Sequence, residues 1–232
     1  MAAVEDNPYQ PPQEAEVDAE DPRDPPLRPG LYPLDRVANV CLRLYFATTV
    51  YSVLDYLYRI FAEGGIQQSL HDSAYGSPSH WLDMLNGLAS LASTVLFLIW
   101  KYRAAANARV IDPDAMKISP AMAVGGYFIP LANLLIPYRA MAGIARASGV
   151  ERFWVGAWWV AYLGNWAWII FLTVMAIDAV YAGGKLRQPT VVLYHLVMLW
   201  SVLTFYFFWQ IMVRVTRAQM APASPGEAAI PA

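Results

Sequence analysis

Four runs of apolar residues, each long enough to cross a lipid bilayer, constrain the fold of this chain more than any other feature. They cover residues 37–61, 82–100, 154–181 and 190–213. A transmembrane helix needs about 20 mostly apolar residues and satisfies its own backbone hydrogen bonds. With 57% hydrophobic and only 15% charged residues, the chain is too apolar for a typical soluble domain. The sequence therefore predicts an all-α integral membrane protein with four transmembrane helices.

The segment at residues 119–148 is also apolar, but glycines and prolines interrupt it. Ser119 and Pro120 form a helix start, because a serine hydroxyl can accept a bond from a free amide and proline lacks the amide that would be orphaned there. A helix from Pro120 to Pro130 would rise only about 15 Å, half of the hydrocarbon thickness, before the second proline breaks it. Lipid cannot satisfy backbone groups freed by Pro130 and Pro137. We expect a broken helical segment, re-entrant or interfacial, sheltered between the second and third spans.

Lysine and arginine residues outside the spans indicate the topology, because they are enriched in cytoplasmic loops. With four spans, twelve basic residues lie on the side of the chain termini, and only Lys185 and Arg187 lie opposite. A fifth crossing by the broken segment would give nine against five. We therefore expect four spans and cytoplasmic termini. Lys101, Tyr102 and Arg103 are expected to anchor the end of the second span at the interface.

The two ends of the chain differ from its middle. Residues 1–35 are acidic and rich in proline, and residues 218–232 also lack an apolar run, so we expect two disordered tails around a membrane domain at 36–217. The N-terminal tail could present a proline-rich ligand to a protein partner. A nucleic-acid surface is not indicated, because the basic residues flank hydrophobic runs. Cys41 is the single cysteine, which excludes an intramolecular disulfide and a zinc cluster.

Two adjoining motifs follow the second run: WKYRAAAN, and then SPAMAVGGYFIPLANLLIP. Their distinctive residues are Trp100, Tyr102, Arg103, Asn107, Ser119, Pro120, Phe128, Pro130, Asn133 and Pro137. This combination resembles bacterial membrane proteins grouped as domain of unknown function 4328. The resemblance implies a multi-span protein of the bacterial inner membrane and brings no known activity with it.

Polar residues inside the predicted spans are the candidate functional groups, since ionisable side chains in a membrane commonly mark ion or proton pathways. Near the outer face, Asp55, Asp178 and His195 could hold a metal ion. Nothing in their spacing is diagnostic of such a site, and no metal or other cofactor is expected. The alternative is that polar residues near helix ends reach water or headgroups.

Nearer the cytoplasmic side, Arg43, Asn133 and Asn165 could form a polar intramembrane site. Arg43 lies about two turns into the first span, so it needs a partner, a water-filled cavity or a path to the surface. Asn133 and the carbonyls freed by the prolines could supply that partner. We favour a second interpretation, in which these groups clamp the broken segment between helices.

The sequence carries no catalytic signature: no nucleophile with a base, no metal-ligand motif and no phosphate-binding loop is found. It favours a non-enzymatic membrane scaffold or partner-binding protein that acts through the tail and the broken segment. A small transporter or channel component is the alternative, because interrupted helices near mid-membrane are typical of transporter sites. A membrane-embedded enzyme is the third hypothesis. The sequence specifies no oligomeric state.

Overall fold

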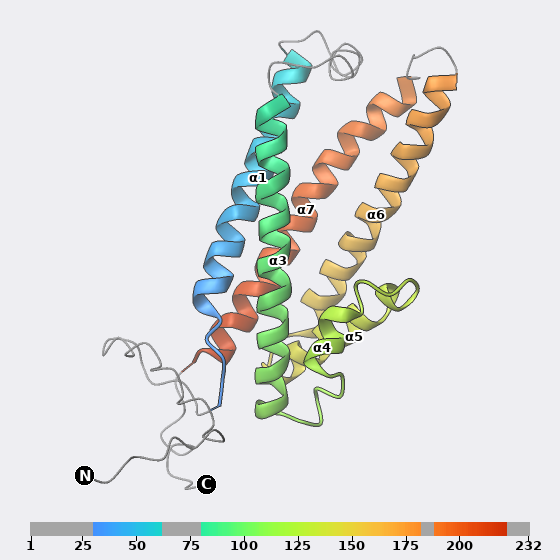
Figure 1. Ribbon diagram of the computed structural model, residues 1–232. Coiled ribbons are helices and arrows are strands. Elements are labelled where there is room, and N and C mark those ends of the chain that lie inside the picture. The colour runs from blue at the N-terminus through green and yellow to red at the C-terminus, as the bar shows by residue number, and fades with distance from the viewer. Residues whose placement is uncertain (1–29, 62–79, 182–187, 222–232) are drawn as a thin grey trace, which may run out of the picture. The chain divides into compact units, whose positions relative to one another are not determined.

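The computed structural model describes residues 30–61, 80–181 and 188–221, and every regular element in these ranges is a helix. The prediction of an all-α chain is confirmed. Four long helices alternate in direction (Figure 1): α1 (Asp35–Phe61), α3 (His80–Ile111), α6 (Arg152–Tyr181) and α7 (Gln188–Gln219). Three short elements lie between α3 and α6, namely α4 (Pro120–Gly125), the 3₁₀ helix η1 (Ala132–Leu134) and α5 (Ile136–Ala147).

Three described stretches of helix are long and apolar enough to cross a membrane: Asp35–Tyr58, Trp81–Ile111 and Leu196–Gln219. Their outward faces carry large apolar side chains that no other part of the chain covers. Exposed examples are Leu54, Leu88, Leu91, Leu199 and Leu203. A water-soluble monomer rarely exposes so much continuous apolar surface. These features make the chain a multi-pass membrane protein by composition and by surface.

The long helices form two antiparallel pairs. α1 packs along α3 and α6 packs along α7, while α7 also contacts α1. Figure 1 shows that the pairs converge where α1 begins and where α3 and α7 end, and we call this the inner end. The buried core is concentrated there, around Trp100, Met141, Ile144 and Met212. The inner end is therefore the rigid base on which the broken segment rests.

α3 does not end at residue 100, where the sequence predicted the end of the second span. α3 continues past Trp100 to Ile111, because the following residues are alanine-rich and contain no proline or glycine before Pro113. Lys101 consequently lies inside the bundle and is completely buried. The expectation that Lys101 anchors a helix end at the membrane interface is wrong.

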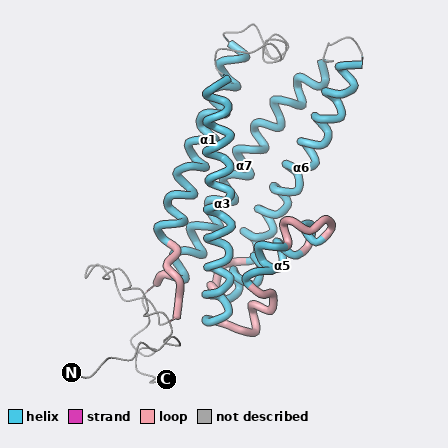
Figure 2. The backbone as a smooth tube through the Cα atoms, in the orientation of Figure 1, coloured by secondary structure: helices cyan, strands magenta, loops and turns pink. Residues whose placement is uncertain are grey.

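The broken segment contains two helices joined by turns, drawn as a looped stretch in Figure 2. The predicted start is confirmed, since the Ser119 hydroxyl accepts from the Met122 amide at 3.2 Å and Pro120 occupies the first turn. α4 ends at Gly125, before Pro130. The adjacent Gly126 has no Cβ, and this allows Ile136 of α5 to pack directly against the backbone there. The chain therefore turns back earlier than the prolines alone predict.

Candidate functional site

The WKYRAAAN motif lies where α3 meets α5 and α7 at the inner end. Trp100 Nε1 donates to Thr216 Oγ1 of α7 at 3.0 Å. The Ala104 carbonyl accepts from Gln219 Nε2 at 3.2 Å, and the same amide donates to Ser148 Oγ, the C-cap of α5, at 3.0 Å. Because these donors and acceptors are largely buried, each bond also avoids the cost of an unsatisfied polar group. The motif thus joins α3, α5 and α7.

Lys101 attaches α3 to the broken segment. Its Nζ donates to the Tyr127 hydroxyl at 2.9 Å and to the Pro137 carbonyl at 3.1 Å. The same nitrogen lies 4.3 Å from the centroid of the Tyr127 ring and 5.9 Å from those of Phe97 and Trp158. The hydroxyl, the carbonyl oxygen and the aromatic faces replace the water that a buried amine lacks. A single lysine therefore holds both limbs of the broken segment against α3.

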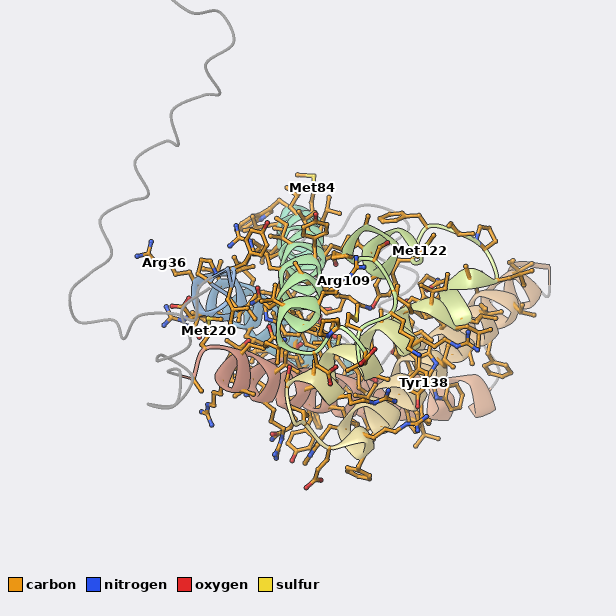
Figure 3. The ribbon with its side chains drawn as sticks, turned by 90° about the horizontal axis from the view of Figure 1, so that it is seen from below. Arg36, Met84, Arg109, Met122, Tyr138 and Met220 are labelled. Atoms are coloured by element: carbon orange, nitrogen blue, oxygen red, sulfur yellow. The ribbon has the colours of Figure 1, made fainter. Side chains whose placement is uncertain are left out.

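Arg103 and Asn107 hold the chain just before α1. Asn107 forms a two-way pair with the backbone of Tyr32: its Oδ1 accepts from the amide at 2.7 Å and its Nδ2 donates to the carbonyl at 2.9 Å. Arg103 Nη1 donates to the Pro33 carbonyl at 3.2 Å. Asn107 is completely buried, so both halves of its amide are satisfied by one extended residue. Figure 3 views this end along the helices, with Arg36 of α1 pointing away from the bundle.

The turn between α4 and α5 satisfies its backbone locally. Among its bonds, Phe128 N donates to Gly125 O, Asn133 N to Ile129 O and Ala132 N to Pro130 O, at 2.7–3.0 Å. The last of these closes a three-residue γ-turn around Leu131, whose φ of +64° is unusual for a non-glycine residue. Pro130 has no amide to satisfy. The turn can therefore expose its side chains without exposing many free backbone donors.

A cavity of about 380 Å³ lies where the broken segment faces the long helices. Its wall is mostly aromatic and comes from all four long helices and the turn after α4. The aromatic residues are Tyr45, Phe97, Tyr127, Phe128, Trp158, Tyr162, Trp166 and Phe208. Its polar lining consists of Ser90, Ser93, Thr94, Thr204, Asn133 and the Cys41 thiol. A concave, mainly apolar site with a few polar groups has the character of a small-molecule pocket.

Asn133 is the polar residue that the broken segment contributes to this cavity. Its Oδ1 atom is buried and has no hydrogen-bond partner. A buried acceptor without a partner costs roughly 1–3 kcal/mol, so it indicates a place for a donor. Close by in sequence, burial raises the pKa of the Tyr127 hydroxyl well above its usual range, which keeps that group neutral. The cavity therefore combines an aromatic wall with a buried acceptor that has no partner, Asn133 Oδ1.

The residues predicted to form the inner polar site do not all meet at the cavity. Arg43 is exposed on the surface of α1. Asn165 accepts from the Ser201 hydroxyl at 3.2 Å, which joins α6 to α7. Asn133 alone of the three lines the cavity. The Pro137 carbonyl accepts from Lys101 Nζ at 3.1 Å.

The outer candidates for a metal ion give no site in the described part of the chain. Asp55 is half-buried on α1. Asp178 and His195 lie in α6 and α7, but their side chains are outside the described residues. Where side chains are described, no group of three or more His, Cys, Asp or Glu residues is arranged to hold a metal ion.

Sequence reasoning missed the functional importance of Lys101 and Tyr127. The signal for Lys101 was available, because Phe97, Trp100, Lys101, Ala104 and Ala108 recur at the spacing of one helix face. All but Phe97 are completely buried on that face. Tyr127 carried no comparable signal, because its position near Lys101 depends on where α4 ends and the chain reverses direction.

The second motif and the long helices can now be compared with known proteins. Residues 79–221 match the family model described as Domain of unknown function (DUF4328), which covers more than half of the chain. The chain belongs to the DUF4328 family. The DUF4328 match takes in α3, the whole broken segment, α6 and α7, and the resemblance drawn from the two motifs is confirmed. No curated protein and no solved structure matches the chain.

Proposed function

We propose that this DUF4328 protein crosses the cell membrane four times, with both termini in the cytoplasm and residues 119–148 as a re-entrant hairpin from the cytoplasmic side. α6 is the fourth span in addition to the three apolar helices. It has 30 residues, and no charged residue occurs between Trp154 and Ile177. A helix of this length rises about 45 Å, more than the hydrocarbon thickness.

The surface of the broken segment supports a re-entrant position. Phe128 and Leu131 are 72% and 81% exposed, and Ile129, Leu134 and Leu135 are also exposed. This cluster would be costly in water but is favourable in acyl chains. The local hydrogen bonds of the turn meet the requirement that backbone in lipid be satisfied internally.

The charge of the inner end supports a cytoplasmic orientation. Exposed arginines surround it, coming from α1, α3, α5 and α7: Arg36, Arg109, Arg139, Arg146 and Arg217. Positive residues near the ends of spans are retained on the cytoplasmic side. The same side would then hold both termini, in agreement with the count of basic residues in the loops.

For the activity, we propose that the protein binds a small apolar molecule within the membrane, as a carrier or transporter component rather than an enzyme. The observation that carries this proposal is the aromatic cavity with the unpartnered Asn133 Oδ1. The cavity has a volume of about 380 Å³ and is open on one side. A dry cavity engineered to about 150 Å³ already binds benzene, so this larger, mainly apolar one has room for a ligand.

The test is to identify what the cavity retains. Thr94 lines the cavity and is exposed, so Thr94→Phe should fill its mouth with little disturbance of the core. Leu91→Phe places the same ring on an exposed site of α3 that does not line the cavity. Mass spectrometry of solvent extracts should find an apolar compound with the wild type and Leu91→Phe and lose it with Thr94→Phe. Identical extracts from all three proteins would refute the binding function.

A partner-binding scaffold is the second candidate function. One observation favours it: Asn107 and Arg103 fix the backbone of Tyr32 and Pro33, directly after the acidic N-terminal segment. A fixed starting point would hold a bound partner at the membrane. Purification with and without residues 1–29 tests this candidate, since specific loss of a companion protein is expected. An unchanged set of companions would argue against the scaffold.

A further inference from the structure

We propose that the ligand of the aromatic cavity is a neutral amphiphile from the surrounding bilayer, whose hydroxyl or amide N–H donates to Asn133 Oδ1. This inference rests on the binding function proposed above and adds the class of ligand. It follows from three properties of the cavity: its buried acceptor without a partner, the lysine behind its wall and the position of its mouth.

The hydrogen bonds of the residues that line the cavity favour a ligand with a donor group. Ser93 and Thr94 both donate to the Ser90 carbonyl, at 3.0 and 2.9 Å. Thr204 donates to the Trp200 carbonyl at 2.9 Å and the Cys41 thiol to the Ser93 carbonyl at 3.3 Å. These four groups donate to helix backbone. The buried Asn133 Oδ1, in contrast, has no donor, so a ligand that carries a hydroxyl or amide N–H would complete its hydrogen bonding.

The lysine behind the wall disfavours a cation. The aromatic lining would otherwise suit an ammonium group, since such cages recognise cations through the faces of their rings. However, Lys101 Nζ already lies 4.3 Å from the centroid of the Tyr127 ring, and that ring also lines the cavity. A ligand ammonium would have to share this ring with the lysine amine, whereas a neutral headgroup needs no ring face.

The mouth of the cavity faces the lipid-exposed side of the bundle. Three lining residues are also exposed there: Phe128 of the turn, Thr94 of α3 and Trp166 of α6. Phe128 belongs to the apolar tip of the broken segment, which we place among acyl chains. A molecule already dissolved in the bilayer can therefore enter sideways, with its apolar chain against the rings. These three properties together select a neutral, chain-bearing lipid component.

Quenching of tryptophan fluorescence tests the ligand class, because Trp158 and Trp166 line the cavity and bromine quenches indole on contact. The protein is placed in phosphatidylcholine nanodiscs and titrated with bromododecanol, bromododecyl methyl ether, bromododecanoate and bromododecylammonium. The signal is the saturable component that Leu91→Phe retains and Thr94→Phe loses. The alcohol should bind about tenfold more tightly than the ether, since one added hydrogen bond to a buried acceptor has that effect.

Two substitutions at Asn133 identify the acceptor. Asn133→Leu should remove the preference for the alcohol while the ether still binds. Asn133→Asp keeps the acceptor oxygen, replaces the amide NH₂ group with a second oxygen and adds a negative charge. It should therefore retain the preference for the alcohol over the ether and strengthen binding of the ammonium compound. The second variant keeps the test valid if the first does not fold.

The remaining outcomes separate this inference from the binding function. Equal binding of alcohol and ether to the wild type, or tighter binding of either charged compound, would overturn the ligand class and leave the cavity as a binding site. Absence of any saturable component, with all four probes, would overturn the binding function itself. Persistence of the preference for the alcohol in Asn133→Leu would remove Asn133 from the site.

Discussion

Lys101 is the residue on which the inner end depends most. It is completely buried, and its amine nitrogen contacts a phenol, a carbonyl and aromatic faces. A polar group removed from water is stable only where such partners replace its hydration. Because Tyr127 follows α4 and Pro137 lies in the first turn of α5, the same nitrogen ties together the two limbs of the broken segment. Loss of either partner should loosen that segment first.

Tyr127→Phe should lower the free energy of unfolding by roughly 1–3 kcal/mol. The substitution keeps the ring that faces Lys101 but removes the hydroxyl that accepts its bond. The matched control is Tyr102→Phe, one residue after the lysine on an exposed face, where a change within about 0.5 kcal/mol is expected. Thermal unfolding in detergent measures both. Equal effects of the two substitutions would contradict this role for the Tyr127 hydroxyl.

Part of the candidate site could be predicted from single residues, and part could not. Asn133 was predicted as a candidate site residue because a polar amide between two prolines in an apolar segment is unusual and commonly has a functional or structural role. Lys101 was misplaced because a basic residue after a long apolar run normally marks the interface, and the alanines that continue α3 were given too little weight. Arg43 was expected to need a partner, a water-filled cavity or a path to the surface, and it is exposed on the surface of α1.

At the scale of elements, the packing of α4 against α5 depends on Gly126. A Cβ there would lie 2.6 Å from Ile136 Cγ2 and 2.9 Å from Ile136 Cβ, whereas a Cβ at Gly125 would meet no atom within 4 Å. Gly126→Ala should therefore cost about 1–3 kcal/mol through overpacking. Gly125→Ala should be neutral or mildly stabilising, because alanine favours the helix. Thermal unfolding of the two variants tests this difference, and an equal loss in both would show that the contact with Ile136 is unimportant.

The γ-turn at Leu131 gives a second prediction about an element. A φ of +64° is strained for any residue with a Cβ and most strained for a β-branched one. Stability should therefore decrease from Leu131→Gly to the wild type to Leu131→Val, with about 1–2 kcal/mol between the extremes. Because Leu131 is exposed, loss of core packing cannot produce this order. Chemical unfolding of the three proteins measures it, and a Leu131→Gly variant less stable than Leu131→Val would rule out backbone strain.

The existence of the long helices was largely predictable from the sequence, but the residues at which α3 and α4 end were not. α1, α6 and α7 begin within a few residues of the predicted runs, because apolar length alone defines a spanning helix. The end of α3 was missed because hydropathy falls where the helix leaves the apolar run, although helix propensity stays high. The early end of α4 arises from a tertiary contact, the approach of Ile136 to Gly126. A contact between distant residues of this kind has no local signal.

For the whole molecule, the position of the broken segment decides the topology. α3 and α7 end at the inner end, where α1 begins, and α6 begins close to the end of α5. If α4 and α5 enter and leave by the same face, the number of crossings is even and both termini lie on the same side of the membrane. A fifth crossing would instead place the exposed arginines of α5 and α7 on the outer side, against the distribution of basic residues.

Accessibility of single cysteines tests this topology, with the buried Cys41 as the internal negative control. Val110→Cys at the end of α3 and Glu151→Cys before α6 should both react with a membrane-impermeant maleimide in inverted vesicles and not in right-side-out vesicles. Leu131→Cys should react in neither preparation, because lipid covers the tip, and should become reactive after denaturation in SDS. Labelling of Val110→Cys and Glu151→Cys from opposite sides would establish a fifth crossing. Reaction of Leu131→Cys in intact inverted vesicles would place the segment at the membrane surface, where the cavity could no longer receive its ligand from the bilayer interior.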